Sequence, residues 1–482
     1  MFLRNIFKKR VRVRSAPSPT GDPHIGNLRT VLFNYLFAKS EGGVFIIRVE
    51  DTDRKRNVPE SDKKFLSALR WLGLLWDKGP YYQSQRLSIY KSYAETLIKK
   101  KHAYYCFCDE ERLNALRVEQ ENKGAVTKYD KFCLSLSPEK VEANLKSKIP
   151  YVIRMSIPSD SIITFNDMLR GAISVSGEEV DDQIIIKSDG FPTYHLASVI
   201  DDYKMRITHV IRGEEWLPST PKHILLYKFF GWKPPLFVHV PLVLNSKRQK
   251  LSKREGSFAV ETLAHEGYLP SAVVNYLALL GWHPEGDREI YLPEELISLF
   301  HLESLQKAPA IFDYEKLKWF NAQHIRKLSI SELKKAVLDY FRNYGYGLNA
   351  PDDFFTRFLE VEQNRLTLLK DAEELIKPFL ADKLAFERKM LLWKNMTEGD
   401  VKNSLSFSLR VLENVDESEW NTATLEKILK ENIEKEGLTN GEVLWPLRVA
   451  LTGKEKSPSP FECAYILGKE KTLLRIDDAL KN

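Results

Sequence analysis

Residues 11–53 read VRVRSAPSPTGDPHIGNLRTVLFNYLFAKSEGGVFIIRVEDTD, and this stretch decides the fold. Val11–Arg14 alternates between apolar and basic residues as a strand does, and a loop rich in Pro and Gly follows it. A helix is predicted next, because apolar residues recur there at helical spacing: Leu28, Val31, Leu32, Tyr35 and Leu36. Val44–Val49 is almost continuously apolar, which suits a parallel strand covered on both faces.

The strand and helix signals continue in the same order along the chain. Pro59 opens a second predicted helix, and strand and helix signals return at Tyr194–Ile200, Thr208–Arg212 and Pro221–Phe230. This order predicts an open α/β sheet with right-handed crossovers. Residues from about 90 to 190 are more mixed, with short strands predicted near Tyr151–Met155 and Gln183–Ile186. We interpret them as an insertion into the sheet domain.

Beyond about residue 330 the pattern becomes helical. Ser329-Ile330-Ser331-Glu332 has the spacing of a capping box, in which a serine hydroxyl and a glutamate satisfy free amides at a helix start. Further amphipathic helices are predicted at Phe354–Leu369 and Thr424–Glu436. The sequence therefore predicts a helical carboxy-terminal domain.

Length and composition exclude several classes of protein. The 482 residues exceed one ordinary domain, and 43% hydrophobic with 29% charged residues excludes wholesale disorder. The most apolar stretch, Ala272–Trp282, is too short to span a membrane. Four cysteines cannot form a disulfide framework, and the Arg-rich amino terminus leads directly into a strand. We therefore expect a soluble, cytoplasmic protein without a targeting segment.

Two short motifs could bind phosphate groups. Pro23-His24-Ile25-Gly26-Asn27 lies where a loop meets a helix, and free amides at a helix start favour an anion. Lys250-Leu251-Ser252-Lys253-Arg254 could form a cationic loop that closes on pyrophosphate. Taken alone, the first is typical of an ordinary helix start and the second of a solvated surface. A net charge of +6 is compatible with a nucleic-acid partner but does not establish one.

Taken together, the two motifs resemble the HIGH and KMSKS signatures of class I aminoacyl-tRNA synthetases. Longer segments resemble bacterial-type glutamyl-tRNA synthetases: RSAPSPTG (14–21), RVEDTD (48–53), GPYYQS (79–84), YHLA (194–197), IRGEEW (211–216) and PLRVALTG (446–453). The resemblance covers essentially the whole chain. It implies a Rossmann-like α/β catalytic domain with an α+β insertion, followed by an all-α anticodon-binding domain.

The resemblance implies glutamate–tRNA ligase activity in two steps. ATP, accompanied by Mg²⁺, activates L-glutamate to glutamyl-adenylate, and the glutamyl group then passes to the 3′ end of tRNA(Glu). His24 and Lys253 match the residues that stabilise the transferring and leaving phosphates. The implied ATP-binding residues are Pro17, Thr20, His24, Gly26, Asn27, Lys250, Ser252, Lys253 and Arg254.

The resemblance also implies a glutamate pocket. Its residues are Arg14, Ala16, Ser18, Glu50, Tyr194, Ser198, Arg212 and Trp216. Arg14 and Arg212 match the family's carboxylate-binding arginines, a role that a planar guanidinium suits, and Glu50 matches the acid expected at the substrate amine. Ser198 departs from the bacterial-type pattern, which often has asparagine there, and the KLSKR loop is a variant of its motif.

A cysteine cluster could bind zinc. Some relatives hold structural zinc with three cysteines and a histidine, where this chain has Ser135; Tyr129 matches a tyrosine of a shortened relative. The candidate ligands are Cys106, Cys108, Tyr129 and Cys133. Zinc in a structural site takes four ligands, so the two alternatives are a zinc site and a vestigial cluster of reduced thiols.

Several alternatives concern specificity and class. The helical carboxy-terminal third argues against a shortened relative and a free-standing nucleotidyltransferase, and no β-barrel pattern supports a glutaminyl-tRNA synthetase. A non-catalytic RNA-binding protein is opposed by His24, Lys253 and Arg14. Arg365 matches loosely an arginine that reads the third anticodon base in discriminating enzymes. A non-discriminating enzyme that also charges tRNA(Gln) is the alternative, and a monomer is expected.

We predict five segments from these patterns and from the resemblance. The catalytic domain comprises 1–88 and 193–245, interrupted by an acceptor-binding insertion at 89–192. A stem-contact region with the KLSKR loop spans 246–328, and the anticodon-binding domain spans 329–482.

Overall fold

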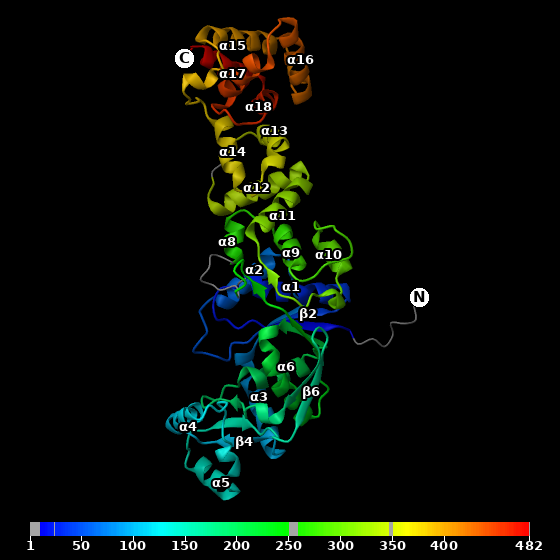
Figure 1. Ribbon diagram of the computed structural model, residues 1–482, viewed down its shortest axis with the longest axis vertical. Helices are drawn as coiled ribbons and strands as arrows, with labels where there is room; N and C mark the ends of the chain where they lie inside the picture. The colour runs from blue at the N-terminus through cyan, green and yellow to red at the C-terminus, as the bar shows by residue number, and fades with distance from the viewer. Residues whose placement is uncertain (1–9, 24, 250–258, 347–349, 482) are drawn as a thin grey trace, which may run out of the picture. The chain divides into compact units, whose positions relative to one another are not determined.

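The computed structural model describes residues 10–23, 25–249, 259–346 and 350–481, which divide into two compact units. The first holds the described residues up to Thr262 together with Val273–Tyr314. The second holds Leu263–Ala272 and the described residues from Glu315 onward. Figure 1 labels the elements of both units in chain order.

The first unit begins with a parallel sheet of three strands. Its strands β1 (Arg12–Ser15), β2 (Val44–Val49) and β3 (Lys78–Tyr82) lie in that order, linked by α1 (Ile25–Ser40) and α2 (Ser61–Trp71). All six residues of β2 are buried, as the apolar run predicted. Burial on both faces is what a central parallel strand requires.

A second set of strands, in a separate sheet, lies next to these three. β9 (His209–Gly213) pairs in parallel with β10 (Leu236–Val240), and α6 (Tyr194–Lys204) and α7 (Thr220–Phe230) accompany them. The Thr208 amide donates to the Arg12 carbonyl at 2.9 Å, so β9 begins beside β1. In doubly wound sheets the point between the two strand sets is where ligands bind.

The insertion between the two strand sets contributes strands to two sheets. It extends the sheet of β9 and β10, because β6 (Ile162–Asp167) lies beside β10 and forms a hairpin with β7 (Gly171–Ser176). An antiparallel sheet has the order β4 (Ala103–Cys106), β5 (Val152–Met155), β8 (Ile184–Ile186), which confirms the short strands predicted there. The insertion's helices are α3 (Leu87–Lys99), α4 (Glu110–Asn122) and α5 (Pro138–Lys146), drawn mainly in cyan in Figure 1.

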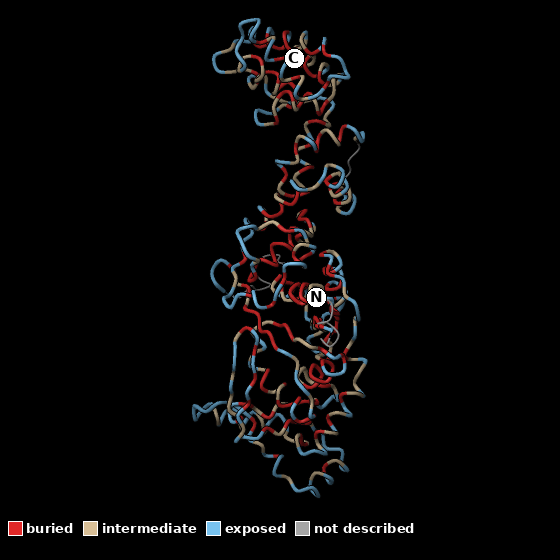
Figure 2. Tube along the Cα trace, turned by 90° about the vertical axis from the view of Figure 1, so that its right-hand side faces the viewer, coloured by how far each residue is buried: buried red, intermediate tan, exposed pale blue. Residues whose placement is uncertain are grey.

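The first unit's strands and helices bury a common core. Buried side chains come from β2, β10 and the helices α3, α6 and α7, and Figure 2 shows the buried positions in red. The unit ends with short elements, and its boundary with the second unit passes through α8 and α9. These elements are β11 (Val243–Leu244), α8 (Val260–His265), α9 (Pro270–Leu279), α10 (Pro293–Leu299) and β12 (Ala310–Ile311).

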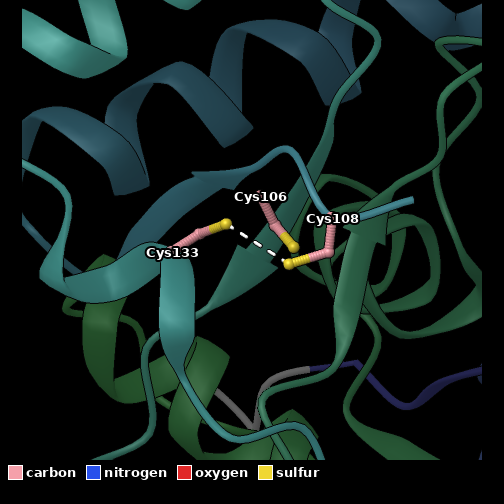
Figure 3. A group of neighbouring side chains, drawn as sticks. All are labelled: Cys106, Cys108 and Cys133. Atoms are coloured by element: carbon pink, nitrogen blue, oxygen red, sulfur yellow. Dashed lines mark hydrogen bonds between the residues drawn. The ribbon is translucent and has the colours of Figure 1, made fainter. Parts of the chain in front are cut away.

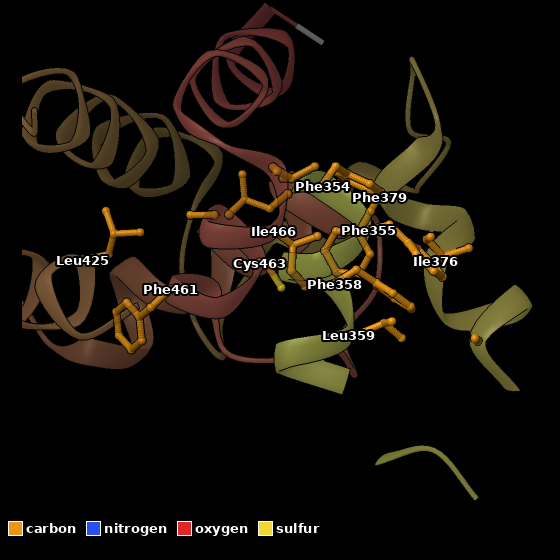
Figure 4. Close-up of a cluster of buried hydrophobic side chains, with 14 of the residues drawn as sticks. Phe354, Phe355, Phe358, Leu359, Ile376, Phe379, Leu425, Phe461, Cys463 and Ile466 are labelled. Atoms are coloured by element: carbon orange, nitrogen blue, oxygen red, sulfur yellow. The ribbon is translucent and has the colours of Figure 1, made fainter. Parts of the chain in front are cut away.

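The second unit is helical in all its described elements of regular structure. Its helices are α11 (Tyr314–Lys327), α12 (Ile330–Tyr344), α13 (Asp352–Glu362), α14 (Asp371–Leu380), α15 (Glu398–Glu413), α16 (Thr422–Lys435), α17 (Asn440–Thr452), α18 (Pro460–Leu467) and α19 (Lys469–Lys481). Figure 4 shows part of their shared core, where aromatic residues of α13 lie near Cys463 and Ile466 of α18. The predicted capping box is confirmed: Ser329 Oγ accepts from the Glu332 amide at 3.3 Å, and Glu332 accepts from the Ser329 amide at 2.8 Å.

One predicted helix is wrong in its second half. Phe354–Leu369 was expected to be continuous, but α13 ends at Glu362 and a single 3₁₀ turn follows. The Asp371 carboxylate accepts hydrogen bonds from the amides of Thr367 (3.0 Å) and Leu368 (2.8 Å). This side chain satisfies free amides just before α14, so the chain starts a new helix there.

Candidate active site

A cavity of about 380 Å³ opens at the carboxyl ends of the parallel strands in the first unit. Its walls include the loop after β1, the start of α1, and the residues that directly follow β2, β9 and β10. Ligands of open α/β sheets bind at this edge. The cavity is therefore the candidate active site.

Eleven residues implied by the sequence resemblance line this cavity. They are Arg14, Ala16, Pro17, Ser18, Thr20, Gly26, Asn27, Glu50, Tyr194, Arg212 and Trp216. Ser198 is not among the lining residues; it is buried and its hydroxyl lies 3.2 Å from the Arg48 guanidinium. His24, Lys250, Ser252, Lys253 and Arg254 lie outside the residues that the structure describes.

Six charged residues, two of which (Arg14 and Glu50) line the cavity, form what we call the buried charge network: Arg14, Arg48, Arg86, Glu50, Asp201 and Asp202. Arg48 is fully buried and donates to Asp202 at 2.6 Å and to Glu50 at 2.9 Å. Arg14 donates through Nε to the same Asp202 oxygen at 3.1 Å. Three guanidinium groups thus face three carboxylates, so the network is neutral as a whole.

The network shifts the pKa values of two of its carboxylates in opposite directions. Burial alone would raise the pKa of Asp202, but Arg48 and Arg14 hold it below its ordinary value. Burial raises the pKa of Glu50, against the opposing effect of Arg48. Glu50 therefore lies at the cavity wall as a carboxylate whose charge would be stabilised by a further cation.

Arg212 projects from β9 and uses all five of its N–H donors. Nε donates to His239 Nε2 at 2.9 Å, and one terminal nitrogen contacts the Tyr194 hydroxyl at 2.8 Å and His223 Nδ1 at 3.2 Å. The other terminal nitrogen donates to Thr220 Oγ1 at 2.8 Å and to the Trp216 carbonyl at 3.4 Å. Such complete pairing holds a guanidinium in one orientation.

Three histidines near Arg212 are held neutral. Burial lowers the pKa of His195 to about 3 and that of His223 well below its ordinary value, and nearby cations act in the same direction. Burial also lowers the pKa of His239, although Asp167 opposes it. The His223 and His239 rings can therefore each offer a lone pair to an N–H group of Arg212.

Sequence reasoning missed several of these residues. Arg48 was visible as a single charge in an otherwise apolar strand, and Asp201-Asp202 as a pair of acids after an apolar helical run. A charge in such a setting is expected to have a buried partner. No comparable signal marked His239, which reads as one more residue of a short strand.

The predicted cysteine cluster is assembled in the insertion. The sulfur atoms of Cys106, Cys108 and Cys133 all lie within 4.8 Å of one another, and Figure 3 shows them pointing together. The Tyr129 hydroxyl lies 3.4 Å from Cys106 Sγ and 3.2 Å from Cys108 Sγ. Two guanidinium groups also contact sulfur: Arg154 contacts Cys106 at 3.4 Å, and Arg112 contacts Cys108 at 3.5 Å.

Arg365 lies in the second unit, in the 3₁₀ turn after α13. Its guanidinium is 3.5 Å from the buried carboxylate of Glu362, and 43% of its side chain is exposed. The head group is therefore anchored at one side and reachable from solvent at the other.

Comparison with known proteins decides the family. Residues 10–319 match the family model described as the catalytic domain of class I tRNA synthetases (E and Q), and residues 323–480 match an anticodon-binding domain. The chain belongs to this family of class I tRNA synthetases. The family resemblance and the fold class predicted from the sequence are thereby confirmed.

Individual relatives match along nearly the whole chain. The glutamate–tRNA ligase of Clostridium acetobutylicum is 43% identical over 477 residues, covering 97% of both chains. That of Clostridium tetani is 44% identical over 490 residues, covering 98% of both. A crystal structure of a glutamate tRNA ligase from Elizabethkingia meningosepticum in complex with its amino acid has a TM-score of 0.89 at 36% identity, and covers 98% of this chain and 100% of its own.

Among the described residues, no helix is both long and apolar enough to cross a membrane.

Proposed function

We propose that the protein is a glutamate–tRNA ligase. It activates L-glutamate with ATP to glutamyl-adenylate and transfers the glutamyl group to the 3′ end of tRNA(Glu), releasing AMP and diphosphate. The observation that carries this proposal is the cavity in which Arg14 of β1, Glu50 just after β2 and Arg212 of β9 come together. The relatives named above, more than 40% identical along nearly the whole chain, support the same activity.

Arg14 is the first residue that we assign to glutamate. Its Nε is fixed by Asp202, and its two terminal nitrogens have no hydrogen-bond partner among the described residues. A guanidinium in this state can hold a carboxylate through two parallel hydrogen bonds. Glu50, at the same wall, is assigned to the substrate ammonium, whose charge favours the ionised carboxylate.

The other carboxylate of glutamate is assigned to Tyr194 instead of directly to Arg212, because every N–H donor of Arg212 is already paired within the protein. Its hydroxyl accepts a hydrogen bond from Arg212, so its own proton is left to donate to another acceptor. Tyr194 lines the cavity, and burial raises the pKa of its phenol, which keeps that proton in place. Ala16, Ser18 and Trp216 complete the wall of the glutamate pocket. Ser198 does not line the cavity, and its hydroxyl contacts Arg48 instead.

The start of α1 is assigned to the phosphates of ATP. This helix of sixteen residues begins at Ile25, and the positive end of its dipole and its free amides favour an anion. Pro17, Thr20, Gly26 and Asn27 line the cavity beside it. His24 and the cationic loop with Lys253 keep the roles expected from the sequence, and Mg²⁺ arrives with ATP.

The second unit is assigned to the tRNA anticodon. Its match to an anticodon-binding domain and its exposed Arg365 support a reader of the third anticodon base. We infer a discriminating enzyme that acts on tRNA(Glu); an enzyme that also charges tRNA(Gln) is the alternative. We further infer a cytoplasmic monomer with the five segments defined above.

The cysteine cluster is assigned to structural zinc. Ligands about 2.3 Å from a tetrahedral zinc ion would lie about 3.8 Å apart, which the sulfur atoms here can satisfy. Three thiolates and the Tyr129 phenolate would exceed the charge of Zn²⁺ by two, and two guanidinium groups touch the cluster. Although burial would raise it, the hydrogen bonds that Cys106 makes with Tyr129 and Arg154 lower its pKa, whereas burial raises the pKa of Cys108 to about 12. Metal analysis of the purified protein should give one zinc per chain; a metal-free protein in which Cys106, Cys108 and Cys133 all react as free thiols contradicts the assignment.

Aminoacylation with radiolabelled glutamate tests the function. Purified tRNA(Glu) and tRNA(Gln) are charged in parallel. Charging of tRNA(Glu) alone supports the discriminating enzyme, and charging of both supports the alternative. Charging of neither contradicts the proposal.

A further inference from the structure

Asp167, His239 and Arg212 lie on three neighbouring strands of the first unit. β10 lies between β6 and β9, and His239 is the direct register partner of Arg212. Asp167 Oδ2 is 2.7 Å from His239 Nδ1, and His239 Nε2 is 2.9 Å from Arg212 Nε. The aspartate and the histidine are 1% exposed or less, so these contacts are shielded from water.

The two contacts determine which ring nitrogen of His239 carries the proton. Arg212 can only donate, so Nε2 must offer a lone pair to it, and the Asp167 carboxylate can only accept, so Nδ1 must carry a hydrogen. The Thr220 hydroxyl accepts from Arg212 and donates its own proton to the Trp216 carbonyl at 3.4 Å, so the Nε2 lone pair is left to Arg212. The opposite tautomer would place a lone pair against Asp167 and an N–H against Arg212.

Asp167 is held firmly enough to impose this choice. One carboxylate oxygen accepts from the amides of Leu169 at 3.0 Å and Arg170 at 2.9 Å, and the other from the His239 amide at 3.1 Å and from the His239 ring. All four partners are donors, which a carboxylate satisfies and an asparagine cannot. Burial would raise the pKa of Asp167, but these hydrogen bonds hold it below its ordinary value.

The far end of this chain of contacts is the cavity. Arg212, fixed through Nε by His239, donates to the Tyr194 hydroxyl at 2.8 Å, and Tyr194 lines the cavity. We propose that Asp167 and His239 are positioning residues for glutamate binding, because they hold Arg212 in the orientation that directs the Tyr194 hydroxyl toward the substrate. This inference rests on the glutamate pocket proposed above. Neither residue touches the cavity itself.

Two substitutions of His239 separate its two contacts. In His239→Asn the amide nitrogen can take the place of Nδ1 and keep Asp167 as its acceptor, but Arg212 loses its partner. In His239→Gln the amide oxygen can take the place of Nε2 and keep the contact with Arg212. A hydrogen bond to a charged group contributes enough to change affinity roughly tenfold or more. We therefore expect His239→Asn to raise KM for glutamate roughly tenfold, and His239→Gln to raise it clearly less.

The assay is steady-state aminoacylation of tRNA(Glu), with glutamate and ATP varied separately. KM for ATP is expected to stay within about twofold in both variants, because Arg212 contacts the glutamate side of the pocket. Asp167→Asn is expected to behave like His239→Asn, which covers the case in which one variant folds poorly. His102→Asn is the matched control, since its ring stacks on Phe229 away from the cavity, and it should leave both KM values unchanged.

Tyr194→Phe separates the inference from the proposal on which it rests. If Tyr194→Phe leaves KM for glutamate unchanged, the assignment of the pocket fails. If Tyr194→Phe raises it but His239→Asn and Asp167→Asn do not, the pocket stands and the positioning role is overturned. The role is also overturned if His239→Gln is as impaired as His239→Asn, or if the KM values for glutamate and ATP rise together.

Discussion

Replacing Arg48 by methionine would remove the central cation of the buried charge network and keep a side chain of similar length. In the intact protein this fully buried guanidinium lies 2.6 Å from Asp202 and 2.9 Å from Glu50. After the replacement Asp202 keeps Arg14 at 3.1 Å, whereas Glu50 loses the guanidinium to which it is hydrogen-bonded. The variant therefore leaves a buried carboxylate unpaired at the cavity wall.

The expected cost is large. Removing one partner of a buried ion pair costs about 3–5 kcal/mol, because an uncompensated charge stays in a poorly solvated site. For a domain of this general size, each kcal/mol lowers the melting temperature by ~2 °C, so we expect a fall of roughly 6–10 °C for the transition of the first unit. Glu50 should also take up a proton more easily, and KM for glutamate should rise because a neutral acid binds an ammonium poorly.

Differential scanning calorimetry of the full chain measures the first effect, and aminoacylation kinetics measure the second. The matched control is Lys123→Met, which removes an exposed cation that lies 2.6 Å from Glu119 in α4. Exposed pairs contribute about 0–1 kcal/mol, so the control should unfold close to the wild-type temperature. If Arg48→Met melts within 2 °C of the control, roughly 1 kcal/mol by the same scale, the reasoning about burial is refuted.

Three further predictions concern the second unit. Burial lowers the pKa of His324 from 6.5 to about 4. The stability that the neutral imidazole contributes is therefore present above pH 6.5, and roughly 3 kcal/mol of it is lost as the pH falls toward 4. Urea unfolding across this pH range should show the loss, and the variant His324→Gln should not show it. Ser329→Ala should lower the stability of this unit by about 1 kcal/mol through loss of its helix cap, and an unchanged urea midpoint would contradict that. Arg365→Ala should reduce the preference for tRNA(Glu) over tRNA(Gln) roughly tenfold in charging assays. Glutamate-dependent ATP–diphosphate exchange should stay intact. Equal charging of both tRNAs by the wild-type protein would contradict this prediction, because there would be no preference to reduce.

Local patterns predicted the parts of the fold that local physics determines. The apolar run of β2 is buried on both faces, and the capping box at Ser329 forms with both of its hydrogen bonds. The expected helix at Phe354–Leu369 failed because Asp371 binds two amides behind it and starts a new helix. A side chain that accepts hydrogen bonds from amides earlier in the chain offers them an alternative to helical hydrogen bonds. The spacing of apolar residues does not predict such a contact.

The site was predictable as a set of residues but not as a set of contacts. Its lining residues came from the motifs carried by the sequence, and the cavity brings most of the described ones together. The contacts beneath it join residues far apart in sequence: Arg14 to Asp202 across 188 positions, and Asp167 to His239 across 72. Local sequence does not show which of these buried polar residues contacts which, because the partners come together only when separate elements pack.

The neutrality of the buried charge network has an evolutionary consequence. Loss of the charge of Arg14, Arg48 or Asp202 alone leaves the network with an uncompensated charge in the interior, and the intermediate protein would be less stable by about 3–5 kcal/mol. A lineage can therefore alter these positions only by compensated steps, or after gaining stability elsewhere. The chemistry at the cavity wall can diversify through substitutions at Ala16, Ser18 or Trp216, whereas the residues of the buried charge network change only together.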